Sequence, residues 1–525
     1  MCDILIKNAI IIDGAKNSKY KADVAISDGK IGKIKRGINT KTGKKIIDAE
    51  NLYLTPGFID LNNHADTFLT LFTIPSQESL LKQGITTILG GNCGSSLAPL
   101  VSAEIIKTIQ KWADISELNL NWLTFDEYLD VLEKKPLGVN FASLVGHSTL
   151  RRGLLKDEFR ELKPKELKIM AEMLKKAMKQ GAFGLSTGLA YSHAKIAAAK
   201  EIMELAKIVK SFEGLYSTHI RGEAEELIPA IEETIELARK IGVNTEILHL
   251  KAMGRKHWPN MKTALEMIDK AQKTKINFDL YPYTSTGSVL YILLPDWVAE
   301  GGKAMLLQRL KDPAIKEKVI KEMQEKKAYE YDKITLAISP VYQSFIGKKI
   351  LEIAAAQKKS IEEAIVNMLL ISEDKVIVFV DTLSEENIEM EMAHPLSFIA
   401  SDGAGYDYEY SKKKSDLVHP RCFGAFPRVL SKYVQEKHIL GWEEAIYKMT
   451  GGPAQKLGLK NRGLIKQGYW ADLVLIDAEK INDRATFENP YQYPEGIKYV
   501  IVNGKIAVEN SAYTGEKAGK ILKKT

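Results

Sequence analysis

The stretch FIDLNNHAD (residues 58–66) follows a Pro-Gly pair and has the pattern of a buried strand that ends at a histidine. The same pattern, an apolar strand ending on a chemically competent side chain and followed by an amphipathic helix, recurs along the chain. The expected strand ends are His64, Cys93, His147, Ser186, His219, His249, Tyr281 and Asp402. Eight strand–helix units form a closed barrel, so the sequence predicts an α/β fold with a (β/α)8 TIM-type barrel.

An open, doubly wound parallel sheet is the competing fold. It would need a glycine fingerprint for phosphate binding after an early strand. The segment GGNCGSS (residues 90–96) is rich in glycine but lacks the G-x-G-x-x-G spacing, and the chain contains no Walker sequence. The barrel is therefore the favoured fold.

The two ends of the chain share a sequence pattern that differs from that of the barrel. Residues 3–55 and the residues after about 460 contain short alternating strands separated by glycine turns. Neither end has enough strands to close a core alone, so we expect one small β-sandwich built from both termini. The expected divisions are 1–55 for the first part of the sandwich, 56–455 for the catalytic barrel and 456–525 for the second part. The long gap before Asp402 predicts an insertion at about 287–346, before the last barrel strand.

Composition narrows the class of protein. The net charge of +7 is spread over mixed Lys/Glu helices such as residues 163–180, which favours a solvated surface over a nucleic-acid groove. No apolar run approaches the roughly 18 residues of a membrane span, and the first residues lack the pattern of a signal peptide. We therefore expect a cytoplasmic protein that binds neither nucleic acid nor membrane. Three cysteines, Cys2, Cys93 and Cys422, are too few for a disulfide framework.

The strand ends carry the chemistry, because the carboxyl ends of barrel strands meet at one mouth. Six of the eight expected ends are metal-competent or titratable: His64, Cys93, His147, His219, His249 and Asp402. A set of thiolate, imidazole and carboxylate groups suits Zn²⁺ better than Mg²⁺ or Ca²⁺. Three protein ligands leave a position for water, whose pKa then falls toward about 7. The predicted reaction class is metal-assisted hydrolysis.

Several motifs resemble one known family. They include TPGFIDLNNHAD (55–66), GAFGLSTGLAY (181–191), STHIRGE (217–223), ILHLKAMG (247–254), FDLYPYTS (278–285), ASDG (400–403) and HPRCFGAFPRVL (419–430). Together they resemble the N-acyl-D-amino-acid deacylases (D-aminoacylases) of the amidohydrolase superfamily, in the family's order and over nearly the whole chain. The resemblance implies a TIM-type barrel beside a small β domain, and hydrolysis of N-acyl-D-amino acids to a carboxylate and a free D-amino acid.

The resemblance also implies roles for individual residues. The tightly bound zinc would be held by Cys93, His219 and His249, and Asp402 would be the general acid/base and touch a second, weaker metal. The residues that would hold the substrate carboxylate are Lys251, Tyr191, a tyrosine of the YPY motif (Tyr281 or Tyr283) and Ser288. The expected partner is a small N-acyl amino acid; the sequence does not indicate an oligomeric state.

One position departs from the family's pattern. The first strand of that family ends in D-x-H-x-H, but here the first histidine is replaced by Asn62 and only His64 remains. Asparagine is a poor ligand for a transition metal, so the weaker second site is impaired. We therefore expect one tightly bound zinc, with His64 as an uncertain ligand of the weak site.

Three further residues have expected roles of other kinds. Arg221 is expected to form a structural salt bridge with Glu223, and His147 is expected to orient a neighbour. Arg421 is a weaker candidate for reaching the substrate carboxylate.

Two alternatives stay open. One is hydrolysis of another linear or cyclic amide, although GAFGLSTG has no lysine for the metal-bridging carbamate typical of cyclic amidases. The other is a non-catalytic relative that keeps the barrel, which Asn62 alone supports.

Overall fold

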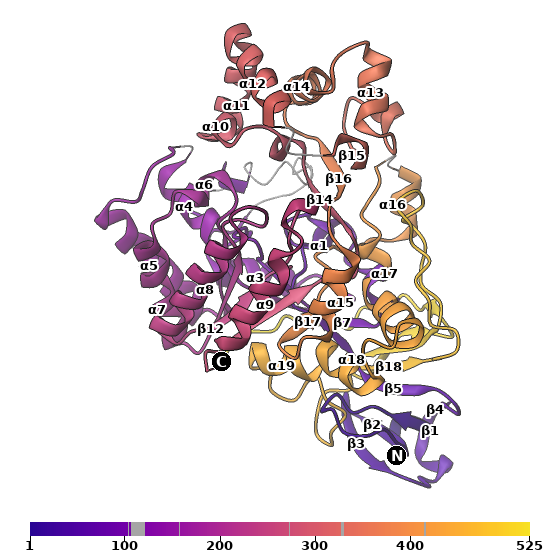
Figure 1. The fold of residues 1–525 in the computed structure, drawn as a ribbon. Coiled ribbons are helices and arrows are strands. Elements are labelled where there is room, and N and C mark those ends of the chain that lie inside the picture. Colours follow the sequence, from indigo (N-terminus) through magenta and orange to yellow (C-terminus); the bar gives the residue numbers. More distant parts are fainter. Residues whose placement is uncertain (103, 107–120, 157, 272, 327–329, 414–415) are drawn as a thin grey trace.

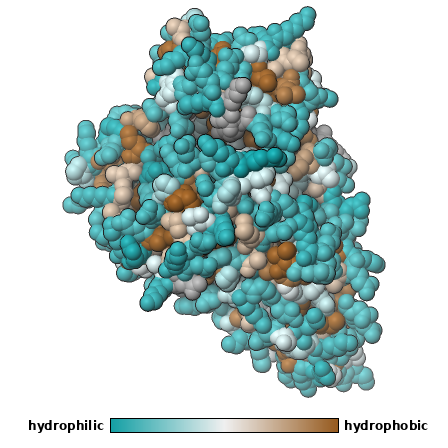
Figure 2. Space-filling view, viewed as in Figure 1, coloured by the Kyte–Doolittle hydropathy of each residue, from teal (hydrophilic) through white to brown (hydrophobic). Residues whose placement is uncertain are grey.

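The computed structural model describes residues 1–525 apart from residues 103, 107–120, 157, 272, 327–329 and 414–415. Figure 1 shows three parts: a central barrel with its helices, a sheet of terminal strands at the bottom and an inserted unit at the top. The visible surface is mostly hydrophilic with scattered apolar residues (Figure 2). Within the described residues, no helix combines the length and apolar content needed to cross a membrane.

The barrel strands are parallel and occupy eight positions in the described chain. Their bounds are β6 (Phe58–Asp60), β7 (Ile85–Gly90), β8 (Asn140–Ser143) continued by β9 (Val145–Gly146), β10 (Gly184–Gly188), β11 (Leu215–His219), β12 (Asn244–Ile247), β13 (Ile276–Leu280) and β17 (Ser397–Ile399). One sheet has the order β6-β7-β8 and the other β17-β13-β12-β11-β10-β9. A parallel bridge between Asn63 and Gly403 joins the ends of the first and last strands. The predicted TIM-type barrel is confirmed.

Amphipathic helices cover the outside of this barrel. They include α2 (Glu78–Leu81), α3 (Phe125–Glu133), α4 (His147–Leu155), α5 (Pro164–Lys179), α7 (Ala199–Ser211), α8 (Leu227–Ile241), α9 (Asn260–Lys270), α15 (Glu385–Ala393), α17 (Arg421–Arg428), α18 (Trp442–Met449) and α19 (Gly451–Leu457). Thr124 and Glu127 form a capping box at the start of α3. The helices bury their apolar faces on the strands, while a separate apolar cluster that includes Leu89, Phe183 and Phe398 fills the barrel interior. This double burial explains why the strands read as continuous apolar runs.

The terminal strands form one nine-stranded sheet. Its members are β1 (Cys2–Ile11), β2 (Tyr20–Ser27), β3 (Lys30–Lys35), β4 (Gly43–Asp48), β5 (Tyr53–Pro56), β18 (Leu473–Ile476), β19 (Ile497–Val502), β20 (Lys505–Glu509) and β21 (Ala512–Tyr513). Strands β5 and β18 pair antiparallel and join the two halves of the chain, which confirms the expected small domain built from both termini.

The end of the chain leaves the terminal sheet and packs on the barrel. The backbone N–H of Phe141 donates to Lys520 O at 2.9 Å, and Leu522 N–H donates to Phe141 O at 2.8 Å. These last residues belong to the expected range 456–525 but contact the barrel, so the domain divisions 1–55, 56–455 and 456–525 stay predictions.

The inserted unit is larger than the sequence predicted. It contains an antiparallel sheet of β14 (Ser285–Val289), β16 (Ile377–Asp381) and β15 (Ile334–Ile338), in that order, together with α10 (Asp296–Ala299), α11 (Gly302–Lys311), α12 (Pro313–Lys326), α13 (Ile350–Gln357) and α14 (Ile361–Ile371). These elements share an apolar core of their own. The expected end near Ile346 is too early, because the central strand β16 lies about 30 residues further along the chain.

Candidate active site

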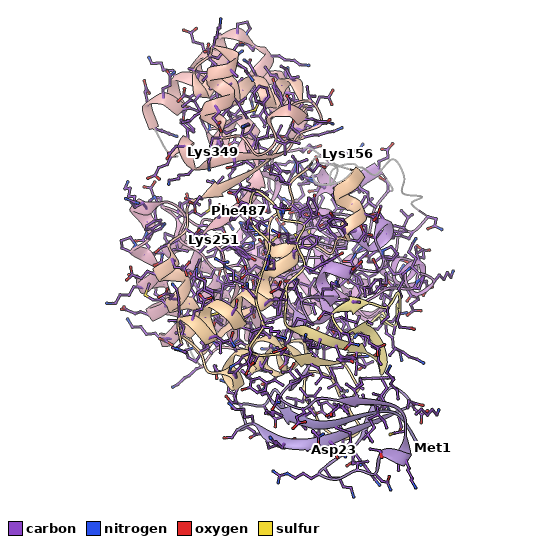
Figure 3. All side chains as sticks on the ribbon, turned by 90° about the vertical axis from the view of Figure 1, so that its right-hand side faces the viewer. Met1, Asp23, Lys156, Lys251, Lys349 and Phe487 are labelled. Atoms are coloured by element: carbon purple, nitrogen blue, oxygen red, sulfur yellow. The ribbon has the colours of Figure 1, made fainter. Side chains whose placement is uncertain are left out.

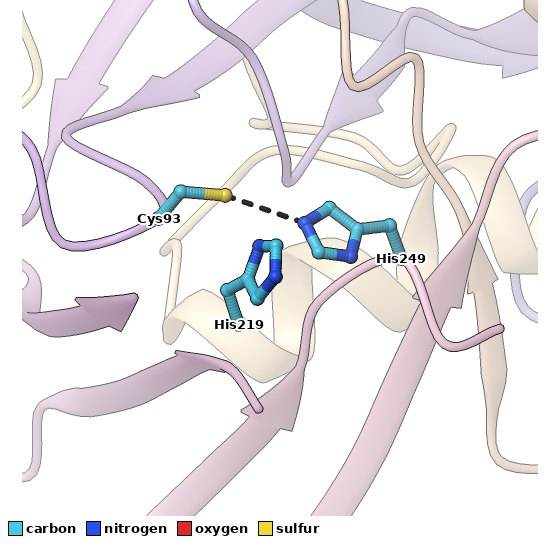
Figure 4. Close-up of side chains that lie close together, drawn as sticks. All are labelled: Cys93, His219 and His249. Atoms are coloured by element: carbon cyan, nitrogen blue, oxygen red, sulfur yellow. Dashed lines mark hydrogen bonds between the residues drawn. The ribbon is translucent and has the colours of Figure 1, made fainter. Parts of the chain in front are cut away.

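The side chains of Cys93, His219 and His249 meet at the mouth of the barrel. Cys93 Sγ lies 3.3 Å from His249 Nε2 (Figure 4), and the ligand atoms of all three residues lie within 4.8 Å of one another. Each residue is buried. His219 ends β11, whereas Cys93 and His249 lie just beyond the ends of β7 and β12. The structure thus brings together the three residues expected to hold the tightly bound metal.

Three residues of this mouth have an unusual backbone conformation. Cys93, His249 and Asp402 have φ values of 51°, 35° and 49°, in the left-handed region that side chains rarely adopt. Such a conformation costs of order 1–3 kcal/mol and persists only where surrounding contacts hold it. The N–H of His249 donates to Asp279 Oδ1 at 2.8 Å, and the N–H of Asp402 donates to Asn62 O at 2.8 Å. Backbone strain concentrated at one site is typical of a functional centre.

A second cluster overlaps the first and includes the predicted general acid/base. His64 Nε2 lies 3.0 Å from Asp402 Oδ1 and 4.0 Å from Cys93 Sγ. The other carboxylate oxygen of Asp402 lies 2.7 Å from the Arg421 guanidinium. Burial, the largest single influence, would raise the pKa of Asp402, but Arg421, His249 and His64 together outweigh it and hold this pKa well below its usual range. Asp402 is therefore a carboxylate at neutral pH.

The donor set fits zinc. A thiolate with two imidazoles is a usual ligand set for this ion. Nδ1 of His219 is buried and has no hydrogen-bond partner among the described residues, which is the condition of a nitrogen directed at a missing ligand. Burial, and secondarily Asp402, raises the pKa of the Cys93 thiol well above its usual value. A divalent cation at this point would instead favour the thiolate.

Glu223 lies behind the two histidines and was not recognised as a site residue from the sequence. Its Oε1 lies 2.5 Å from Lys251 Nζ, 3.3 Å from His249 Nδ1 and 3.5 Å from His219 Nε2. Burial alone would raise the pKa of Glu223, but its interactions with His219, Lys251 and His249 lower it, so the group is ionised. The four-residue spacing from His219 in STHIRGE was the only sequence signal for it.

The expected salt bridge between Arg221 and Glu223 is wrong. Arg221 pairs with Glu233 of α8 through both carboxylate oxygens, at 2.8 and 2.9 Å, and donates to the carbonyl of Lys195. Arg221 points toward α8, because the chain has left the strand after His219 and the alternation of sides no longer applies. Glu223 instead contacts His219, His249 and Lys251.

His147 does not join the cluster at the mouth. It is the first residue of α4, and its Nε2 lies 2.7 Å from Glu201 Oε1. Glu201 in turn accepts two hydrogen bonds from the Arg151 guanidinium. The expectation that all six metal-competent strand ends converge is wrong at this position, because the strand gives way to a helix that turns the ring toward α7.

The structure distinguishes the two tyrosines of the YPY motif. Tyr281 lies beneath the Arg421 guanidinium, 4.7 Å from the guanidinium carbon to the ring centre. Tyr283 instead packs against His419, Phe487 and Arg428. Only Tyr281 is in direct contact with a neighbour of Asp402.

The remaining expected substrate residues lie at different distances from the centre. The Tyr191 ring lies 4.9 Å from the His219 ring. Lys251 is labelled in Figure 3 on the side of the barrel that faces the insert, and its Nζ donates to His249 O at 2.8 Å. Ser288 lies in β14 of the inserted sheet, opposite Val378. Contact of these residues with a substrate stays a prediction.

His419 is a further residue that the sequence did not single out. Its Nε2 donates to Ser285 O at 2.9 Å, and its Nδ1 accepts a hydrogen bond from the Arg421 N–H at 3.1 Å. It therefore connects the base of the insert to the start of α17, which carries Arg421.

Comparison with known proteins identifies the family of this chain. A family model described as the amidohydrolase family matches residues 45–274 and 418–508. The chain belongs to the amidohydrolase family. This amidohydrolase is 31% identical over 524 residues to D-aminoacylase of Alcaligenes xylosoxydans xylosoxydans. The aligned region covers 100% of this chain and 98% of that relative. The resemblance to the N-acyl-D-amino-acid deacylases is thus confirmed.

Two solved structures are similar to this amidohydrolase over almost its whole length. One is a D-aminoacylase, studied for the role of its binuclear metal centre and described by one-metal activation and second-metal attenuation, with a TM-score of 0.84, 29% identity and 100% coverage of both chains. The other is N-acyl-D-glutamate deacylase of Bordetella bronchiseptica with zinc and a phosphonate inhibitor, with a TM-score of 0.84, 27% identity and 99% coverage of both chains.

Proposed function

We propose that this protein is a zinc-dependent N-acyl-D-amino-acid deacylase, which hydrolyses the amide bond to give a carboxylate and a free D-amino acid. The observation that carries the proposal is the meeting of Cys93, His219 and His249 beside the carboxylate of Asp402. The similar proteins named for this activity, which match over the full length, support it.

Cys93, His219 and His249 would hold one zinc ion. When bound, the ion supplies a Lewis acid that polarises the scissile carbonyl and lowers the pKa of water. The charge of the Cys93 thiolate would partly neutralise the cation, and the two imidazoles would complete a set of three protein ligands that leaves one position open.

Asp402 performs the proton transfers. Because it is ionised at neutral pH, it accepts a proton from the attacking water and then delivers this proton to the amide nitrogen as the bond breaks. Its two oxygens contact His64 and Arg421, and these contacts fix the plane of the carboxylate. A fixed general base of this kind contributes about 10²- to 10⁴-fold to the rate.

The substrate carboxylate binds to the cationic and hydroxyl groups around the centre. Lys251 Nζ, the Tyr281 hydroxyl and Tyr191 are the nearest candidates, and Ser288 adds a hydroxyl from the insert. Holding the carboxylate would align the amide with the attacking water and so reduce the entropic part of the barrier.

We further propose that one zinc ion suffices for activity. Asn62 donates its side-chain N–H to Asp279 Oδ1 at 3.3 Å, and an amide is a poor ligand for a transition metal. His64 and Asp402 would offer a weak second site at most. The one-metal activation described for the solved D-aminoacylase is consistent with this stoichiometry.

Zinc-reconstituted protein assayed with paired N-acetyl-D- and N-acetyl-L-amino acids tests the function. We expect hydrolysis of the D series. The panel includes neutral and acidic side chains, so that it also defines which side chain of the substrate is preferred. Turnover of the L series only, or of cyclic amides only, would refute the assignment. Cytoplasmic location and a small-molecule partner stay predictions.

A further inference from the structure

Among the residues that the structure describes, Glu223 is the one carboxylate in contact with a ring nitrogen of both candidate histidine ligands. It lies four residues after His219, between β11 and α8, and its carbonyl accepts a hydrogen bond from the N–H of Met253 at 2.7 Å. This backbone contact ties the segment after β11 to the segment after β12. The side chain of Glu223 is 11% exposed, so water screens its contacts weakly.

The ring nitrogens of His249 have separate tasks. Nε2 faces the Cys93 sulfur at 3.3 Å, so Nδ1 is the rear nitrogen. A neutral imidazole that gives the Nε2 lone pair to a metal carries its proton on Nδ1 and needs an acceptor there. The two groups near Nδ1 are Lys251 Nζ at 2.7 Å and Glu223 Oε1 at 3.3 Å. An ammonium group cannot accept a hydrogen bond, so Glu223 is the acceptor.

His219 presents the opposite nitrogen. Its Nδ1 is the buried nitrogen without a partner in the described chain, and its Nε2 lies 3.5 Å from Glu223 Oε1. The two imidazole rings are nearly perpendicular, at 82°, with centres 4.5 Å apart. One carboxylate oxygen can therefore restrain both rings from behind while their front nitrogens stay free of protons.

The same oxygen also holds Lys251. The ammonium group of Lys251 lies 2.5 Å from Glu223 Oε1 and 2.8 Å from His249 O. The third N–H group faces His249 Nδ1 at 2.7 Å, a nitrogen that carries a proton in the metal-binding tautomer and then cannot accept, so this N–H group remains for an anionic substrate group. Lys251 is thereby kept at the mouth, and its stem has few other positions because the residue is buried.

We propose that Glu223 is a shared positioning residue, which fixes the tautomers of His219 and His249 for zinc and holds Lys251 for the substrate carboxylate. This inference rests on the proposed zinc-dependent function. It predicts that one substitution weakens both metal binding and substrate binding, although Glu223 would touch neither.

Three variants test the inference: Glu223→Gln, Lys251→Met and the control Glu233→Gln. Glu233 is a partly buried carboxylate that pairs with Arg221 and lies outside the site. Zinc affinity is measured by competition with a chromogenic chelator, KM and kcat are measured on zinc-loaded protein, and circular dichroism checks the fold. We expect zinc affinity to fall about 10- to 100-fold in Glu223→Gln, with a rise in KM. We expect Lys251→Met to raise KM but keep its zinc affinity, and Glu233→Gln to change neither.

The outcomes separate the inference from the proposed function. Wild-type protein that binds no zinc would refute the function. Wild-type protein that binds zinc while folded Glu223→Gln binds it equally well would refute the role of Glu223. A Lys251→Met protein that loses as much zinc affinity as Glu223→Gln would also refute it, since lysine would then account for the whole effect.

Discussion

Arg421 and Asp402 form a buried ion pair at the mouth of the barrel, with 2.7 Å between the guanidinium nitrogen and the carboxylate oxygen. Arg421, together with His249 and His64, keeps Asp402 ionised in a place where burial would otherwise protonate it. The backbone N–H of Arg421 in turn donates to Nδ1 of His419, which holds the start of α17. A carboxylate held in the ionised form can act directly as a general base.

Replacing this carboxylate separates proton transfer from metal binding. In Asp402→Asn we expect kcat to fall about 10²- to 10⁴-fold, because the amide cannot accept the proton of water. Zinc content, measured by atomic absorption, should stay at the wild-type level, since Asp402 is not among the three main candidate ligands. Asp381→Asn, at an exposed strand end of the insert, is the control and should keep full activity. Asp402→Asn protein with wild-type kcat would contradict the proposed mechanism.

Metal binding depends on a single thiol. We expect Cys93→Ser to hold far less than the roughly one zinc per chain of the wild type, because a serine hydroxyl is a poor substitute for thiolate. Cys2→Ser is the matched control, since Cys2 is also a buried free cysteine but lies in β1 of the terminal sheet. Elemental analysis after dialysis measures both. Equal zinc contents in the two variants would exclude Cys93 as a ligand.

The number of metal ions should depend on position 62. We expect wild-type protein to keep about one zinc per chain and Asn62→His to bind a second in excess zinc, because a second imidazole then joins His64. Titration followed by elemental analysis gives the stoichiometry, and kcat measured over the same titration shows whether the second ion attenuates activity. Two tightly held ions in the wild type would contradict the expected single site.

The two tyrosines of the YPY motif should differ in their effect on substrate binding. A hydrogen bond to a charged group contributes about 1.5–3 kcal/mol, so losing the Tyr281 hydroxyl should raise KM about 10- to 100-fold. Tyr283→Phe should leave KM unchanged, since that ring packs among His419 and Phe487. Steady-state kinetics on both variants decides between them. The reverse order of effects would transfer the role to Tyr283.

The buried ion pair of Glu201 and Arg151 should make stability depend on pH. Burial alone would raise the pKa of Glu201, but His147 and Arg151 lower it overall. A carboxylate with a lowered folded-state pKa stabilises the protein above its unfolded pKa, and this contribution is lost as the pH falls through the folded value. Glu201→Gln should therefore cost about 3–5 kcal/mol near pH 7, because it leaves Arg151 buried without a counter-charge.

Thermal unfolding of wild type and Glu201→Gln across pH 3–7 measures this effect. The difference in melting temperature should be largest near neutrality and shrink as the pH falls from about 4.3, the pKa of an unfolded glutamate, through the lower pKa of the folded protein. Glu204→Gln, on an exposed position of the same helix, should show no such difference. A difference that does not change with pH would contradict the ionised state of Glu201.

The features that the sequence predicted correctly are local ones. Each barrel strand reads as a short apolar run, and its last residues carry the polar side chain, so the eight positions and the cluster at the mouth followed from the pattern. The features that it missed depend on distant contacts. The central strand β16 of the insert pairs with β14, which lies about 90 residues earlier, so nothing local marks the end of the insert.

Side-chain direction beyond the strand ends was equally hidden. His147 and His219 both follow apolar strands, but the first begins a helix and faces Glu201, while the second faces the mouth. Arg221 and Glu223 are two residues apart, yet one pairs with α8 and the other with the histidines. These directions depend on backbone turns after the strands, which sequence spacing does not determine.

The backbone hydrogen bond from Asp402 to the carbonyl of Asn62 does not involve the side chain at position 62. Mutation can therefore exchange imidazole for amide at this point without displacing the proton acceptor. The number of metal ions bound and the position of the catalytic carboxylate can therefore change independently during evolution. A lineage can lose one ion and still hydrolyse its substrate.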